Sequence, residues 1–196
     1  MVLILERVAT LIFRKKMLPI ETMVELEQWI EDLPPDINRS LGDKDLPEKL
    51  GLKVEYVDHR KLPEDTEAEL RPTDVPGYHG LIRINNNFKH TLFPYMHEII
   101  HYLKDVGIGN NVTQVFTRKS TGKTKTEDEQ RVNYLTASAV MRYRDIKKAL
   151  DKYDAEWPKV DELVFVDSLC KKYQQDRVAV MRRIREVRRL HRYRSR

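Results

Sequence analysis

The chain has 196 residues and a net charge of +5, and 34% of its residues are charged and 40% hydrophobic. This length and composition are typical of a soluble globular protein with a buried core. Charged residues interrupt the apolar stretch at residues 2–13, which also lacks a basic lead and a small-residue cleavage site, so we expect neither a membrane span nor a secretion signal. The single cysteine, Cys170, excludes an internal disulfide and agrees with a cytoplasmic protein.

The first forty residues show the apolar periodicity of an amphipathic helix. The apolar positions recur at spacings of three and four, and they are Met23, Leu26, Ile30 and Leu33. Two prolines, at residues 34–35, are expected to end this helix because proline cannot continue it. A short second helix is predicted at residues 46–50, where Gly51 supplies the stop.

Two strands are predicted before the most apolar helix of the chain. Residues 53–58 alternate between polar and apolar side chains, like a half-buried strand. Residues 59–79 are rich in proline and charge, which indicates a long surface loop with room for one short strand. The second strand is expected at residues 79–85, and a helix follows at residues 89–104, with Gly107 as its stop.

The second half of the chain is predicted to be helical. Residues 108–126 are polar and are expected to form a mobile connection. One long helix is predicted at residues 127–152, followed by a break at residues 157–158, which are Trp and Pro. Two last helices are expected at residues 161–173 and 176–191.

The most specific motif of the chain is HEIIH at residues 97–101, an HExxH pattern inside the apolar helix. Residues four apart lie on one face of a helix, so His97 and His101 can bind the same metal ion. Glu98 then lies beside the metal and not on it, which is the position of a general base that takes a proton from water. Two surface histidines on an ordinary amphipathic helix are the alternative, which the apolar neighbours disfavour.

A third metal ligand is expected from the helix that begins near residue 127. A catalytic zinc usually has three protein ligands and one open position, and the acidic candidates are Glu127, Asp128 and Glu129. Thr126 and Glu129 also have the spacing of a capping box, in which the glutamate binds a backbone amide of the helix terminus and no metal. From the residues alone, both roles of Glu129 remain open.

Three segments together resemble the ImmA/IrrE family of metallopeptidases, which bacteria, phages and integrative elements encode. The segments are GLIRINNN, HEIIHYL and EQRVNYLTASAVM, and the resemblance covers residues 46–145. It implies that Glu129 is the third zinc ligand and that Asn133, one turn later, lies behind a ligand. Four packing positions differ from the family's second motif, and they are Val132, Leu135, Thr136 and Arg142.

The expected fold class is α+β and mostly helical. A small sheet lies beside a zincin-like HExxH helix and a second ligand-bearing helix, and a C-terminal helical pair follows. We expect three parts, namely an N-terminal helical segment at residues 1–44, a zinc metallopeptidase core at 45–155 and basic C-terminal helices at 156–196.

The resemblance implies a zinc-dependent endopeptidase that makes limited cuts in a regulatory protein, often a transcriptional repressor of the phage or mobile-element type. The strand at residues 80–85 is expected to hold an extended substrate by strand addition. A function of another class remains open, namely a catalytically silent, metal-containing regulatory module that acts by binding protein or DNA.

Positive charge is concentrated at the C-terminal end. Residues 177–196 hold nine arginines and one acidic residue, Glu186. Helical spacing places five arginines on one stripe, and they are Arg182, Arg185, Arg189, Arg192 and Arg196. Such a stripe can bind nucleic-acid phosphates, but a solvated helix that is docked on the body or on an acidic partner is the favoured interpretation.

Overall fold

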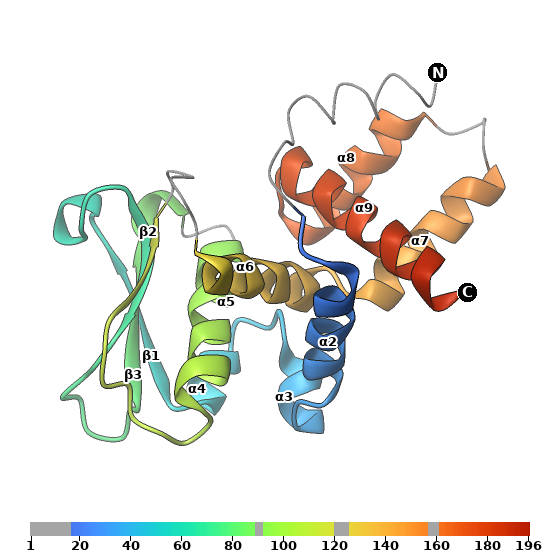
Figure 1. Cartoon of the computed structure of the whole chain (residues 1–196). Coiled ribbons are helices and arrows are strands. Elements are labelled where there is room, and N and C mark those ends of the chain that lie inside the picture. The colour runs from blue at the N-terminus through green and yellow to red at the C-terminus, as the bar shows by residue number, and fades with distance from the viewer. Residues whose placement is uncertain (1–16, 89–91, 120–125, 157–160) are drawn as a thin grey trace.

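The computed structural model describes residues 17–88, 92–119, 126–156 and 161–196. Within these ranges the protein is a mostly helical α+β fold with one small mixed sheet, as the sequence predicts. Figure 1 shows the sheet at one side of the molecule, the helices α5 and α6 in the middle, and the helices α7, α8 and α9 at the other side. No helix in the described ranges is long and apolar enough to cross a membrane.

The sheet has four strands in the order β1-β3-β2-β4. Their bounds are Leu52–Val57 for β1, Thr66–Arg71 for β2, Gly80–Asn85 for β3 and Phe116–Lys119 for β4. β1 runs parallel to β3, whereas β2 is antiparallel to both β3 and β4. Both edges of β3 are therefore already paired, so the prediction that β3 holds a substrate by strand addition is wrong. Among the described strands, β1 and β4 form the two edges of the sheet.

The strand β4 lies inside the segment that was expected to be a mobile connection, so that prediction is wrong for residues 116–119. The sequence Phe-Thr-Arg-Lys has no apolar alternation, because only Phe116 is hydrophobic. Its pairing with β2 and the contacts of Phe116 and Arg118 with α5 hold it in the sheet. These are contacts between residues far apart in the chain, which a local pattern does not show.

The helices follow the prediction except for a short helix at Pro35–Ser40, which was not expected, and for one break. Their bounds are Ile20–Glu31 for α2, Pro35–Ser40 for α3, Leu46–Lys49 for α4, Leu92–His101 for α5, Glu127–Val140 for α6, Tyr143–Glu156 for α7, Glu162–Tyr173 for α8 and Arg177–Arg194 for α9. The single helix predicted at residues 127–152 is two helices, because Met141 has φ −123° and ψ 79°. The Met141 carbonyl accepts a hydrogen bond from Arg183 in α9 (2.9 Å), so a tertiary contact accompanies the break. The predicted break at residues 157–158 lies outside the described residues.

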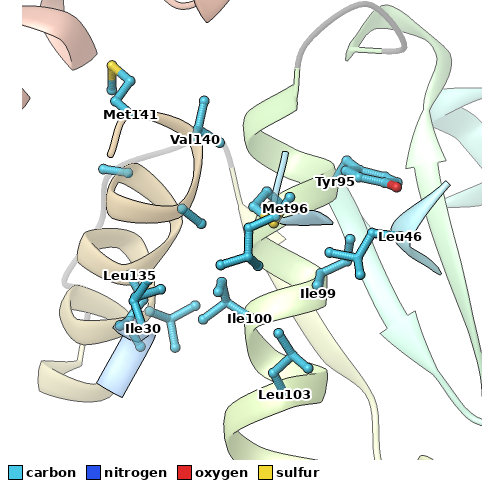
Figure 2. Packing of buried hydrophobic residues seen from close by; sticks show 14 of the residues in the cluster. Ile30, Leu46, Tyr95, Met96, Ile99, Ile100, Leu103, Leu135, Val140 and Met141 are labelled. Atoms are coloured by element: carbon cyan, nitrogen blue, oxygen red, sulfur yellow. The ribbon is translucent and has the colours of Figure 1, made fainter. Parts of the chain in front are cut away.

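The helix α5 lies between the sheet and α6 and fills the centre of the core. Met96, Ile99 and Ile100 are fully buried. Figure 2 shows Ile100 on the side of α5 that faces α6, close to Leu135, and Ile99 on the side of Leu46. Burial of an aliphatic side chain of this size contributes about 1.5–3 kcal/mol, so α5 is fixed by packing on both sides. This packing determines which residues of α5 reach the polar site described below.

A buried ionic cluster ties α2, α6 and α9 together. One carboxylate oxygen of Glu27 accepts hydrogen bonds from the Tyr134 hydroxyl, the Ser138 hydroxyl and Arg183, each at 2.8 Å. Burial alone would raise the pKa of Glu27, but the charge of Arg183 and these hydrogen bonds lower it below its usual value. The buried charge is therefore satisfied by donors from two helices, one of which carries the metal-ligand candidate Glu129.

Candidate metal centre

The HExxH residues lie in the last two turns of α5, where His97 and Glu98 are fully buried and His101 is almost so. Immediately after His101 the chain forms a π-helix, Tyr102–Val106. This form is rare in proteins as a whole, but it often occurs at functional sites. Gly107 ends it with φ +92°, a left-handed conformation that favours glycine, so the predicted stop is confirmed.

Three side chains from α5 and α6 converge at one point. The Nε2 atom of His97 lies 3.5 Å from Oε2 of Glu129, and Nε2 of His101 lies 3.2 Å from Oε1 of Glu129. Potential ligand atoms of the three residues all lie within 4.8 Å of one another. His97, His101 and Glu129 can therefore hold one metal ion, with two imidazole ligands from α5 and a carboxylate from α6.

The distances also fit the size of a small divalent ion. Ligand atoms at about 2.0–2.1 Å from a tetrahedral zinc ion lie about 3.3 Å from each other. The two contacts of Glu129, at 3.5 Å and 3.2 Å, are close to that separation. The Nε2 atom of His97 is buried and lies 3.5 Å from Oε2 of Glu129, so the described structure gives this nitrogen no hydrogen bond of normal length.

Glu129 is oriented toward the histidines, which bears on the choice between metal ligand and helix cap. The Thr126 hydroxyl accepts a hydrogen bond from the Glu129 backbone amide at 3.2 Å, so this half of the capping box is formed. The Glu129 carboxylate contacts His101 and His97, and these contacts hold its pKa well below the usual range. Its neighbours Glu127 and Asp128 are largely exposed, and they pair with Arg131 and Lys104 instead.

Glu98, which follows His97 directly in the sequence, is completely buried. No hydrogen bond of normal geometry reaches either carboxylate oxygen from the described residues, although the Leu70 backbone lies near enough to lower the pKa. Burial dominates and raises the pKa of Glu98 to about 8. A buried carboxylate without a partner is costly, and burial with a strongly raised pKa makes Glu98 a candidate functional residue.

The two histidines have different surroundings on the side away from Glu129. The Nδ1 atom of His101 lies 2.7 Å from Oδ2 of Asp105 in the π-helix. Burial alone would lower the pKa of His101, but the hydrogen bonds to Asp105 and Glu129 raise it to about 9. For His97, burial lowers the pKa to about 3, so its ring is neutral. His101 is thus held by carboxylates on both ring nitrogens.

Behind His97 lies an arginine that the sequence did not reveal. Arg118 of β4 places Nη1 3.2 Å from Nδ1 of His97 and 2.9 Å from Oδ1 of Asn133. Its Nε atom donates to Glu67 at 2.6 Å, and its guanidinium lies 4.7 Å from the centre of the Phe93 ring. Asn133, which was expected behind a ligand, also donates from Nδ2 to the backbone carbonyl of Glu129. It is therefore linked to His97 through Arg118.

Sequence reasoning missed three residues of this site, namely Asp105, Phe116 and Arg118. The Phe116 ring stacks on His101 with ring centres 4.9 Å apart. Asp105 follows His101 by four residues, and this spacing could have identified it. Phe116 and Arg118 belong to β4, and no local pattern in the sequence marks them.

The C-terminal arginines do not form one free basic stripe. Arg182 bonds to Glu186 at 3.0 Å, and Arg189 donates to the Leu18 carbonyl at 2.8 Å. Arg183, which lies outside the predicted stripe, is fully buried in the ionic cluster. Arg183 and Arg189 therefore hold α9 against the body of the protein, whereas the pair of Arg182 and Glu186 lies within α9 itself.

No family model matches the chain, and no curated protein matches its sequence.

Proposed function

We propose that the protein is a zinc-dependent endopeptidase that makes limited cuts in a regulatory protein. One observation carries the proposal, namely the convergence of His97, His101 and Glu129 beside the buried carboxylate of Glu98, which has no hydrogen-bond partner of its own among the described residues. Two imidazoles, one carboxylate and an adjacent glutamate make up the residue set of a zinc-dependent hydrolase.

The residues of the site have distinct roles in this proposal. Zinc, held by His97, His101 and Glu129, would supply a Lewis acid that polarises the scissile carbonyl and makes water more acidic. Glu98 accepts a proton from the attacking water and passes it to the leaving amine. Its burial strengthens it as a proton acceptor, because the charged carboxylate is poorly solvated. Asp105 holds His101 in place through Nδ1.

An extended peptide would bind along β4 in this proposal. β4 has one neighbour among the described strands, β2, so its other edge offers backbone groups for strand addition. Phe116 and Arg118 of the same strand contact His101 and His97. A segment that adds to β4 would therefore pass next to the candidate metal centre, which β3 cannot provide because it is paired on both sides.

The substrate class comes from the resemblance to ImmA/IrrE metallopeptidases in HEIIHYL and EQRVNYLTASAVM, and we propose a transcriptional repressor of the phage or mobile-element type. The test is to incubate the zinc-loaded protein with candidate repressors, beginning with any that a neighbouring gene encodes, and to identify the fragments by mass spectrometry. A single pair of fragments, absent with Glu98→Gln, is the expected result. Tight binding without cleavage would instead identify a catalytically silent regulatory module.

A further inference from the structure

The two histidines of the centre face opposite kinds of hydrogen-bonding group on their outer nitrogens. Nδ1 of His101 faces a carboxylate, Asp105, which only accepts hydrogen bonds when ionised. Nδ1 of His97 faces a guanidinium, Arg118, which only donates them. The two distances are 2.7 Å and 3.2 Å, so both are direct contacts.

This difference matters because a neutral imidazole carries a single N–H. A histidine that binds a metal through Nε2 has its proton on Nδ1, and that proton is normally given to an acceptor. Asp105 is such an acceptor for His101. Arg118 requires the opposite arrangement at His97, in which Nδ1 accepts and Nε2 carries the proton. In that tautomer Nε2 of His97 has no lone pair for a metal.

We propose that Arg118 is a positioning residue that holds His97 in the tautomer unable to bind metal, so that metal binding requires Arg118 to leave Nδ1. The proposal rests on the metal centre proposed above and adds a control on its affinity. His97 keeps one proton throughout, which moves from Nε2 to Nδ1 when Arg118 turns away. Arg118 therefore weakens metal binding, whereas Asp105 strengthens it.

Three further contacts show that Arg118 is held firmly in its place. Glu67 binds its Nε at 2.6 Å, Asn133 binds Nη1 at 2.9 Å, and the Phe93 ring lies under the guanidinium at 4.7 Å. The side chain is only 13% exposed. Nη1 of Arg118 meets both Asn133 Oδ1 and His97 Nδ1, so the asparagine amide and the imidazole share one donor atom.

The position of Arg118 on β4 extends this control to the edge of the sheet. β4 is the strand along which we expect a peptide to bind, and Arg118 and Phe116 alternate with Thr117, so both face α5. A shift of β4 moves the guanidinium relative to His97. Occupation of this edge and metal affinity are therefore linked through one side chain.

The first measurement is the tautomer of His97 in the metal-free protein, read from long-range proton–nitrogen correlations of the imidazole rings by NMR. The wild type is expected to show the proton of His97 on Nε2, and Arg118→Met is expected to shift it toward Nδ1. A proton on Nδ1 of His97 in the metal-free wild type would overturn the proposal. This result does not depend on metal binding or on any activity.

The second measurement is zinc affinity, by competition with a coloured chelator. Arg118→Met should bind zinc about 10-fold more tightly than the wild type, since groups that contact a metal ligand typically change affinity by about 10–100-fold. Arg118→Gln should bind zinc more tightly still, because the glutamine amide oxygen can accept a hydrogen bond from Nδ1 of His97. Both variants lose the same positive charge, so a difference in their zinc affinities reports the hydrogen bond between the glutamine and Nδ1 of His97. Arg118→Lys keeps charge and donor and should stay near wild type.

The control is Arg83→Met, which removes another sheet arginine that is paired with a buried glutamate, Glu69, at 2.8 Å. It should leave zinc affinity unchanged. If Arg118→Met does not fold because Glu67 loses its partner, the paired variant Arg118→Met/Glu67→Met removes both charges. Unchanged or weaker zinc binding in the Arg118 variants would overturn the control by Arg118 while the metal centre stands. No zinc binding in any protein, wild type included, would overturn both.

Discussion

Oδ2 of Asp105 lies 2.7 Å from Nδ1 of His101, on the side of the ring opposite to the nitrogen that meets Glu129. This contact leaves Nε2 available for a metal once its proton is released, because Asp105 keeps the other proton on Nδ1. The π-helix that follows α5 carries Asp105 and so supplies the contact.

Asp105→Ala is therefore expected to weaken zinc binding about 10–100-fold, because His101 loses its fixed orientation and some of its basicity. The chelator competition described for Arg118 measures this change. Asp128→Ala is the matched control, because Asp105 and Asp128 both contact Lys104, at 2.6 Å and 3.5 Å. Asp128 is largely exposed and has no contact with a histidine in the described structure. Equal affinities for the two variants would contradict a role for Asp105.

Glu98→Gln should keep the zinc and the fold but lose hydrolysis. The amide has nearly the same shape as the carboxylate but cannot accept a proton from water, and the loss of a general base typically lowers the rate by about 10²–10⁴-fold. Cleavage of the repressor is followed by gel electrophoresis, and bound zinc by elemental analysis. Hydrolysis by Glu98→Gln at the wild-type rate would show that another group is the base.

Glu129→Ala should remove one of three ligand candidates and so sharply reduce zinc binding, which we expect to be about one ion per chain in the wild type. Glu127→Ala is the control because Glu127 is exposed and pairs with Arg131 at 2.9 Å. If Glu129 were only a helix cap, its loss would lower the free energy of unfolding by about 1 kcal/mol and leave zinc affinity unchanged. Zinc titrations and thermal melts of both variants separate the two cases.

Arg183→Met should destabilise the protein by about 3–5 kcal/mol, because it leaves the charge of Glu27 buried without its cationic partner. Urea unfolding measures the change. Arg188→Met, which breaks an exposed pair with Asp154, should cost less than about 1 kcal/mol. A similar loss for both would show that the buried cluster contributes no more than a surface pair.

The same cluster predicts the response to acid. Since the folded state lowers the pKa of Glu27 from 4.5, the stabilisation is fully present above about pH 4.5 and is lost as the pH falls toward the lower value. When the pH falls from 5 to 3, the free energy of unfolding should therefore decrease less in Glu27→Gln than in the wild type. Parallel pH profiles for the two proteins would contradict this assignment.

Some features of the fold and site follow from local patterns. The spacing of HEIIH places His97 and His101 on one face of a helix, and the apolar residues around them identify α5 as a core element. The third ligand candidate could be identified as Glu129 only through a family resemblance, because Thr126 and Glu129 equally fit a helix cap. The structure shows that the Glu129 backbone amide donates a hydrogen bond to the Thr126 hydroxyl while the Glu129 carboxylate faces the histidines.

Other features depend on contacts between residues far apart in the chain. The hydrogen bond from Arg183 to the Met141 carbonyl accompanies the break between α6 and α7 and joins residues 42 positions apart. Arg118 reaches His97 from 21 positions away, on a strand whose sequence is mostly polar. Helical periodicity carries no information about either contact, so the pattern alone predicts one long helix and a loop.

The link between Glu27 and Arg183 spans 156 residues, which has a consequence for how the protein is made. Ribosomes synthesise α2 and α6 before α9, so Glu27 remains without its guanidinium until α9 has been translated. We therefore expect α6, and with it Glu129, to acquire its final packing only after α9 has been synthesised. Limited proteolysis of ribosome-bound chains of increasing length would show protection of α6 only after α9 has emerged.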